Sequence, residues 1–125
     1  MSFKHTHYLD IPNKLVIFQA EGEEYDPEQI ENFLKAAIQL THNYHFCGIL
    51  LDMRELVVAY DKSSMLDIFI RMRDEDWLGD LRIARYITEK GNFNQLIGDI
   101  CQKYNLPIRN FTLRNQALSW LVHKL

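Results

Sequence analysis

Hydrophobic and polar positions along the chain follow two different periods, which predict a mixture of strands and helices. Residues 6–11 and 14–21 have the composition of strands, and Pro12 with Asn13 between them favours a tight turn, so we expect an antiparallel hairpin. Residues 46–53 form a short apolar run without alternation, which is typical of a central parallel strand covered on both faces. Residues 81–88 and 107–112 are further strand-like runs.

Four segments carry the spacing of amphipathic helices. The first begins at Asp26, an N-cap residue followed by Pro27 at the first helical position and by Gln29, which is placed to close a capping box. The second begins at Asp61, and the third follows the turn at residues 90–92. The residues expected to face the core are Ile30, Phe33, Leu34, Ala37, Ile38 and Thr41 in the first helix, Met65, Ile68, Phe69 and Met72 in the second, Leu96, Ile97, Ile100, Cys101 and Tyr104 in the third, and Ala117, Leu118, Leu121, Val122 and Leu125 in a fourth helix from Asn115.

The order of these elements predicts one α/β domain over residues 1–125. After the N-terminal β-hairpin the chain alternates helix and strand with short connections, which favours a mostly parallel sheet of about five strands with one antiparallel edge, together with four helices. A chain of 125 residues, 47% of them hydrophobic, is large enough for one core and too short for two independent ones.

Charge and apolar run lengths limit the classes of partner. The formal net charge of −3 gives no general attraction to phosphate backbones, so we expect no nucleic-acid partner. The longest apolar run is far shorter than the roughly 20 residues needed to cross a bilayer, and the N-terminus lacks a signal-peptide core, so we expect a cytoplasmic protein without a membrane span. Cys47 and Cys101 both lie in apolar segments, which favours free thiols in a reducing compartment.

The end of the central strand is one place where chemistry is expected. Open α/β sheets bind ligands beyond the carboxyl ends of their strands, and Asp52 with the loop predicted at residues 54–60 lies there. The alternative is structural, with Asp52 accepting hydrogen bonds from neighbouring backbone N–H groups. Two histidine pairs, His5 with His7 and His42 with His45, could each share a face, but solvent exposure and the helix dipole explain them, so we expect no metal and no cofactor.

The start of the second helix is the other place. Asp61 can cap this helix, and Ser63 and Ser64 fall in its first turn, where exposed N–H groups and the helix dipole favour an anion such as phosphate. Leu66 and Ile70 widen the apolar arc of this helix beyond what one sheet contact needs. They would contact either a partner or a neighbouring helix.

Four features together resemble a known family. They are the N-terminal hairpin, the central sequence Gly-Ile-Leu-Leu-Asp-Met at 48–53, the helix start Asp-Lys-Ser-Ser-Met-Leu at 61–66, and Phe111 followed by Ala-Leu-Ser-Trp-Leu at 117–121. This order and spacing resemble STAS domains related to the SpoIIAA anti-sigma-factor antagonists, and most of all the bacterial SpoIIAA-like branch of unknown activity. The resemblance implies the α/β fold described above and a regulatory role.

The same resemblance implies a phosphorylation site. In the antagonists a strand ending in Leu-Asp or Leu-Asn leads to Asp-Ser-Ser-Gly-Leu at a helix start, where a partner kinase phosphorylates a serine. Asp61, Ser63 and Ser64 resemble that start, which makes the two serines the candidate phosphoacceptors. Lys62 is inserted after the aspartate, and Met65 replaces the glycine that gives a kinase access to the backbone.

Three functions are compatible with these patterns. The first is a non-enzymatic regulatory or protein-interaction module that docks a partner protein or a second copy of the chain through the second helix and the segment before it. The second is binding of a small molecule or lipid at the carboxyl edge of the sheet next to that helix. The residues expected to form the interaction or ligand surface are Met53, Leu56, Val58, Tyr60, Met65, Leu66, Phe69 and Ile70.

The third function is phosphoacceptor chemistry at Asp52, as in response-regulator receivers. Receivers need an acidic pair after the first strand and a lysine after the last one. Glu21 with residues 23–24 could form the acidic pair. No lysine follows residues 107–112, however, where Arg114 is the nearest cation. The chain also has one parallel strand fewer than a receiver. No nucleophile triad, phosphate loop or zinc spacing indicates another enzyme.

Overall fold

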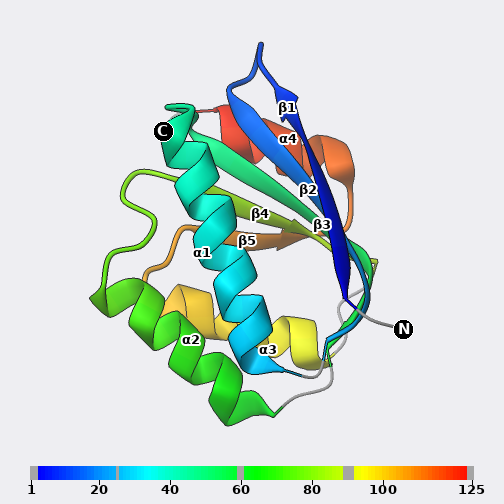
Figure 1. Cartoon of the computed structure of the whole chain (residues 1–125), viewed down its shortest axis with the longest axis vertical. Helices are drawn as coiled ribbons and strands as arrows, with labels where there is room; N and C mark the ends of the chain where they lie inside the picture. Colours follow the sequence, from blue (N-terminus) through cyan, green and yellow to red (C-terminus); the bar gives the residue numbers. More distant parts are fainter. Residues whose placement is uncertain (1–2, 25, 59–60, 89–91, 124–125) are drawn as a thin grey trace.

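The computed structural model describes residues 3–24, 26–58, 61–88 and 92–123 of the chain. Its elements, in chain order, are β1 (Lys4–Asp10), β2 (Leu15–Glu24), α1 (Pro27–Asn43), β3 (Gly48–Val58), α2 (Lys62–Asp74), β4 (Arg82–Tyr86), α3 (Asn92–Lys103), β5 (Ile108–Phe111) and α4 (Arg114–Val122). The five strands form one sheet in the order β1-β2-β3-β4-β5 (Figure 1). Strand β1 is antiparallel to β2 and the other neighbours are parallel, which confirms the predicted fold.

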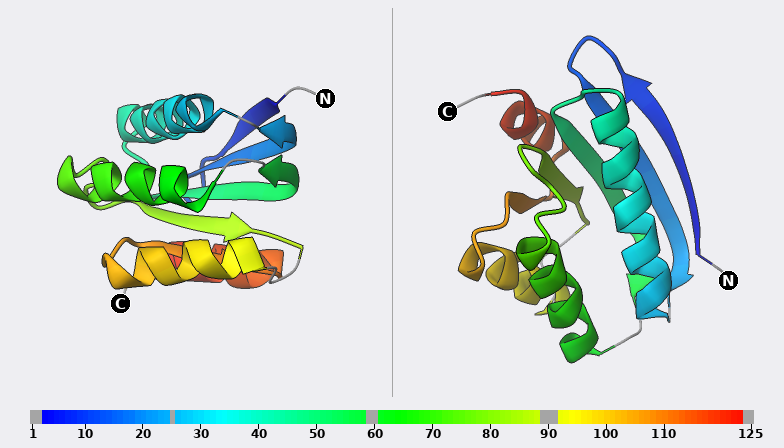
Figure 2. Two further views of the ribbon diagram at one scale, coloured as in Figure 1. Left: turned by 90° about the horizontal axis from the view of Figure 1, so that it is seen from below. Right: turned by 60° about the vertical axis from the view of Figure 1, so that its left-hand side comes forward.

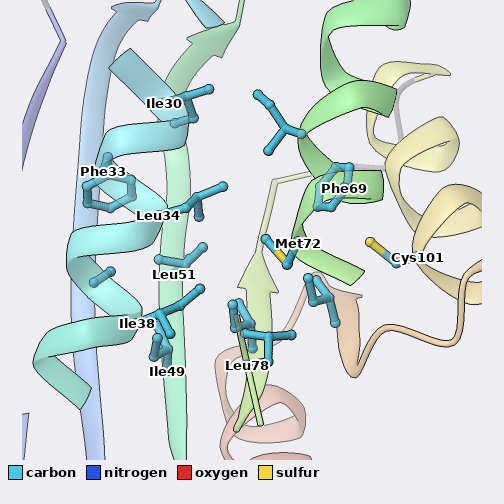
Figure 3. Packing of buried hydrophobic residues seen from close by; sticks show 14 of the residues in the cluster. Ile30, Phe33, Leu34, Ile38, Ile49, Leu51, Phe69, Met72, Leu78 and Cys101 are labelled. Carbon is cyan, nitrogen blue, oxygen red and sulfur yellow. The ribbon is translucent and has the colours of Figure 1, made fainter. Parts of the chain in front are cut away.

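The helices cover the sheet unequally, because three of them share one face. Figure 1 shows α1 in front of the sheet and α4 behind it, and Figure 2 shows α1 and α2 side by side. The larger core lies between α1, α2, α3 and the sheet, where side chains from all three helices meet those of β3 (Figure 3). A smaller core lies between the sheet and α4, around Leu50, Ala117 and Leu121.

The apolar spacing of the first helix predicts its buried face correctly. All six predicted inward residues are buried, and the same holds for the four predicted in α2. Thr41 is buried because its hydroxyl donates to the Ala37 carbonyl oxygen at 2.8 Å. Hydrophobic periodicity therefore determines which side of each helix meets the sheet.

The start of α1 differs from the predicted capping box. Asp26 caps the helix as expected and accepts the Glu28 backbone N–H at 3.0 Å. The Asp26 N–H, however, donates to Glu24 Oε1 at 2.7 Å, not to Gln29. Glu24 is only 1% exposed, so the end of β2 supplies the acceptor that Gln29 was expected to supply. The prediction of a closed capping box is wrong for this reason.

Strand β3 is longer than predicted, which corrects the expected loop at residues 54–60. It continues to Val58 because β2 also continues to Glu24 and supplies backbone partners, after a register shift between Gln19 and Glu21. Residues 59 and 60, including Tyr60, lie outside the described residues. The apolar run ends at Met53, but hydrogen bonding to β2 extends the strand beyond it.

The last helix begins one residue earlier than predicted and buries less of its surface. Ala117 and Leu121 are buried and Leu118 is half-buried, whereas Val122 is 38% exposed at the helix end. The expectation that Val122 faces inward is therefore wrong, and Leu125 lies outside the described residues. Gly48 lets α4 approach the sheet, because a Cβ at this position would lie 3.0 Å from Leu121 Cδ2.

Candidate functional site

The first turn of α2 is capped as the sequence predicts. Asp61 has extended backbone angles, and its Oδ1 accepts the Ser64 backbone N–H at 2.9 Å. The Ser63 hydroxyl lies 3.4 Å from the same oxygen. Hydrogen bonds from the Ser64 side chain and backbone, with a smaller contribution from Ser63, hold the pKa of Asp61 below its usual value. The helix N-terminus therefore already holds a carboxylate, and Ser63 is the exposed hydroxyl beside it, whereas Ser64 is half-buried.

The segment before this turn is a strand with one unpaired edge. The pairing of β3 with β4 ends at Asp52 and Tyr86, but the pairing of β3 with β2 continues to Val58. From Met53 onward, no strand within the described residues pairs with the other edge of β3. Val57, on this extension, is 57% exposed, and Leu56 and Val58 are half-buried.

The apolar face of α2 is largely covered by the molecule itself. Met65 is 6% exposed and Phe69 is 4% exposed, so neither side chain is open to a partner. Leu66 is half-buried and packs against the larger core, and Ile70 is half-buried. The structure thus divides the predicted surface. Met65 and Phe69 belong to the core, and the half-buried residues retain some exposed surface; these are Met53, Leu56, Val58, Leu66 and Ile70.

A small cavity lies beneath α2, in the region proposed for an apolar ligand. Four of the predicted surface residues line it together with core residues of α1, α3 and the sheet; these four are Met53, Val58, Met65 and Phe69. Leu56 is not among its lining residues. Its volume is about 30 Å³, whereas pockets for drug-sized ligands measure about 300 Å³ or more. A lipid would fit only if α2 moved outward.

Asp52 lies on the other face of the sheet and is held by Arg54. Its two carboxylate oxygens accept hydrogen bonds from the Arg54 guanidinium: Oδ1 accepts from Nε at 2.9 Å, and Oδ2 accepts from Nη2 at 2.8 Å. Oδ1 also accepts a hydrogen bond from the Arg54 backbone N–H at 3.3 Å. Burial would raise the pKa of Asp52, but the hydrogen bonds from Arg54 outweigh burial and lower it. The Arg54 guanidinium in turn lies 4.3 Å from the centre of the Tyr86 ring.

This geometry supports the structural interpretation of Asp52. The residue is 7% exposed and both of its oxygens accept hydrogen bonds from Arg54, which favours a structural role over phosphoacceptor chemistry. Of the acidic residues considered for a receiver-like pair, Glu24 is engaged at the start of α1. The role of Arg54 was missed, although residues two apart on a strand share one face and an Asp-x-Arg spacing is therefore a usable signal.

The histidines singled out in the sequence contact aromatic rings or backbone. His5 lies 4.6 Å from the Phe33 ring and His7 lies 5.4 Å from the Phe18 ring, measured between ring centroids. His42 Nε2 lies 3.2 Å from the Trp77 carbonyl oxygen. Across the described part of the chain no three His, Cys, Asp or Glu side chains are grouped as metal ligands would be. No described helix is long and apolar enough to span a membrane.

Comparison with solved structures identifies the architecture. A protein of the DUF3478 family from Shewanella loihica PV-4, described as having a SpoIIAA-like fold, matches with a TM-score of 0.57 and 16% identity over 96% of this chain and 94% of that one. The chain has a SpoIIAA-like fold. The Bacillus cell fate determinant SpoIIAA in its phosphorylated form matches with a TM-score of 0.50 and 13% identity, over 94% of this chain and 97% of SpoIIAA. No family model and no curated protein matches the sequence.

The shared SpoIIAA-like fold confirms the resemblance noted in the sequence. The alignments cover nearly the whole chain, so the hairpin, β3, α2 and α4 all belong to the shared architecture. At these identities the likeness concerns the fold, and the site must be argued from the residues of this chain.

Proposed function

We propose that this protein is a non-enzymatic regulatory module that binds a protein partner where the free edge of β3 meets the first turn of α2. The observation that carries the proposal is the extension of β3 beyond β4. A strand with an unpaired edge presents backbone donors and acceptors that a second chain can use. The edge runs from Met53 to Val58 and leads toward Asp61, so one partner could contact both elements.

The side chains at this edge favour a protein partner. Val57 is the most exposed apolar side chain of the extension, and half-buried Leu56 and Val58 lie on the opposite face of the strand. Exposed polar groups follow in the first turn of α2, at Asp61 and Lys62. An apolar centre with a polar rim is the usual composition of a protein interface.

Ser63 gives this surface a means of regulation. Its hydroxyl is exposed and lies 3.4 Å from Asp61 Oδ1, so a phosphate added to Ser63 would repel the capping carboxylate while being attracted by the helix N-terminus and Lys62. Such a phosphate would replace Asp61 as the cap and change the charge of the docking surface. The solved structure of SpoIIAA, whose fold the chain shares, is of its phosphorylated form, which supports this part of the proposal.

A matched pair of variants tests the proposal. The protein is used to capture partners from the cells that make it, in its native form and as V57K and V122K, which place the same charge at two exposed valines. A partner retained by the native chain and by V122K but lost with V57K would support docking at the β3 edge. The proposal is refuted if V57K and V122K retain the partner equally well. It is also refuted if the captured partner is a second copy of the chain and V57K does not weaken that self-association.

Binding of an apolar ligand is a second candidate function, which the cavity beneath α2 favours. Met53, Met65 and Met72 line this cavity, and methionine adapts to irregular guests. A volume of about 30 Å³ requires α2 to move before a larger guest can enter. Native mass spectrometry of the protein taken from cell extract tests this: a bound mass supports the candidate, and the unmodified mass of the chain alone counts against it.

A further inference from the structure

A groove follows the outer edge of β5, at the opposite end of the sheet from β1. It has a volume of about 660 Å³, and its lining comes from α3, residues 105–107, β5, Arg82 of β4 and the end of α4. Strand β5 ends the strand order, so no strand in the described part of the chain pairs with its outer edge (Figure 1). The groove therefore combines an open strand edge with a helix on each side.

The backbone of β5 presents groups to this groove. Ile83 donates to the Pro107 carbonyl oxygen at 3.0 Å, and Ile87 donates to the Phe111 carbonyl oxygen at 2.9 Å. In a parallel ladder the backbone groups of alternate residues point to opposite sides of a strand. The N–H and C=O of Asn110 lie between these positions in the register, and they consequently point outward, where an added strand would bind them.

The position of this edge is fixed by contacts with α3. Asn110 Nδ2 donates to the Asn94 carbonyl oxygen at 2.8 Å, and Asn110 Oδ1 accepts from Arg85 Nη1 at 2.6 Å. Gly98 allows α3 to lie this close, because a Cβ there would be 3.1 Å from Asn110 Nδ2. The edge is thus held in place before any ligand arrives, which lowers the entropy lost on binding.

The two walls of the groove differ in charge. On the α4 side, the Arg82 and Arg109 guanidinium carbons each lie 5.3 Å from the centre of the Trp120 ring. Arg82 Nη1 donates to the Trp120 and His123 carbonyl oxygens at 2.8 and 2.9 Å, and neither arginine forms an ion pair with a carboxylate of the described residues. On the α3 side, the Asp99 carboxylate accepts a hydrogen bond from Gln95 at 2.9 Å, so that wall is polar, carries a negative charge and suits uncharged side chains. A carboxylate is complementary to the α4 side.

We propose that this groove binds an extended acidic peptide segment of a partner protein, which adds to β5 as a further strand. Backbone bonds to Asn110 would supply affinity, and side chains of the added strand would alternate between the two walls. Glutamate or aspartate at every second position places carboxylates against Arg82 and Arg109, and the intervening side chains face the polar wall of α3. This inference does not rest on the site proposed at the β3 edge.

Three labelled octapeptides test the proposal on the native chain: (Glu-Thr)4, (Gln-Thr)4 and (Lys-Thr)4. Threonine favours extended backbone and suits the α3 wall, so only the charge on the other face differs. Fluorescence anisotropy should give the order Glu over Gln over Lys, with at least a tenfold difference between the first and last. Amide NMR signals of Asn110 and Gly98 should shift with the Glu peptide. A dissociation constant of about 1 mM corresponds to a binding free energy of about −4 kcal/mol. If the Glu peptide does not bind at about 1 mM, the proposal is overturned.

Two charge-reversal variants complete the test. R109E should weaken binding of the Glu peptide at least tenfold and strengthen binding of the Lys peptide. K4E, a charge reversal at an exposed lysine of β1, should alter neither affinity. An unchanged preference in R109E would overturn the proposal, as would NMR shifts confined to β3 and α2. Dimerisation of the native chain that R109E abolishes would identify a second copy, not an acidic peptide, as the occupant.

Discussion

The pair formed by Asp52 and Arg54 gives the sharpest prediction about stability, because it separates a structural role of this aspartate from a chemical one. Replacement of Asp52 by Asn keeps the shape of the side chain and removes its charge. The bidentate contact then loses its charge-assisted character, which is worth about 1.5–3 kcal/mol for a bond to a charged group. The Arg54 side chain is 42% exposed, so water recovers part of this energy.

The expected net loss is about 1–2 kcal/mol in the free energy of unfolding, or about 4–8 °C in the melting temperature of a domain of this size. The folded pKa of Asp52 lies below its unfolded value of about 3.9, so the pair contributes fully above about pH 4, and its contribution disappears as the pH falls through the lowered folded pKa. The difference between the native chain and D52N should therefore be present at neutral pH and shrink below about pH 4.

Urea unfolding of the native chain, D52N and E55Q over this pH range measures the effect. Glu55 is an exposed acid on the same strand, so E55Q should change stability by less than about 0.5 kcal/mol. A D52N variant as stable as the native chain at neutral pH would refute the structural role. Formation of an acyl phosphate on Asp52 with acetyl phosphate would show instead that its oxygens are available for chemistry.

Three further predictions concern the core and the thiols. G48A should lower the free energy of unfolding in urea by about 1–3 kcal/mol, because the added methyl group meets Leu121. A variant as stable as the native chain would show that α4 can shift without cost. F33A should cost about 3–5 kcal/mol by the same measurement, since Phe33 is 5% exposed in the larger core, and a loss below about 1 kcal/mol would contradict that packing. Burial raises the pKa of Cys101 to about 12, so iodoacetamide at neutral pH should alkylate half-buried Cys47 well before Cys101. Peptide mass spectrometry measures the two rates of alkylation. Equal rates would contradict the burial of Cys101.

The fold was predictable because its information is local and periodic. The capped start at Asp26, the apolar stripe that follows it and the unbroken apolar run of the central strand each determine one element, and short connections leave few ways to join them. The same reasoning correctly found Asp61 as the cap of α2 with both serines in its first turn.

What the sequence missed depends on partners distant in the chain. The length of β3 depends on β2, whose last residues supply its partners up to Val58. Spacing alone could not decide whether Leu66 and Ile70 are covered, because an apolar arc looks the same whether a helix of the same chain or another molecule covers it. The β5 groove combines residues of β4, α3, β5 and α4, which no local motif brings together.

Hydrogen exchange of the protein bound to its captured partner tests the central claim most directly. Amides of β3 from Met53 to Val58 and of the first turn of α2 should exchange more slowly in the complex than in the free chain, because the partner pairs with that edge. Amides of the buried β3 segment before Met53 serve as the internal reference and should not change. Protection confined to α3 and β5, with the β3 extension exchanging as fast as in the free chain, would contradict docking at the β3 edge.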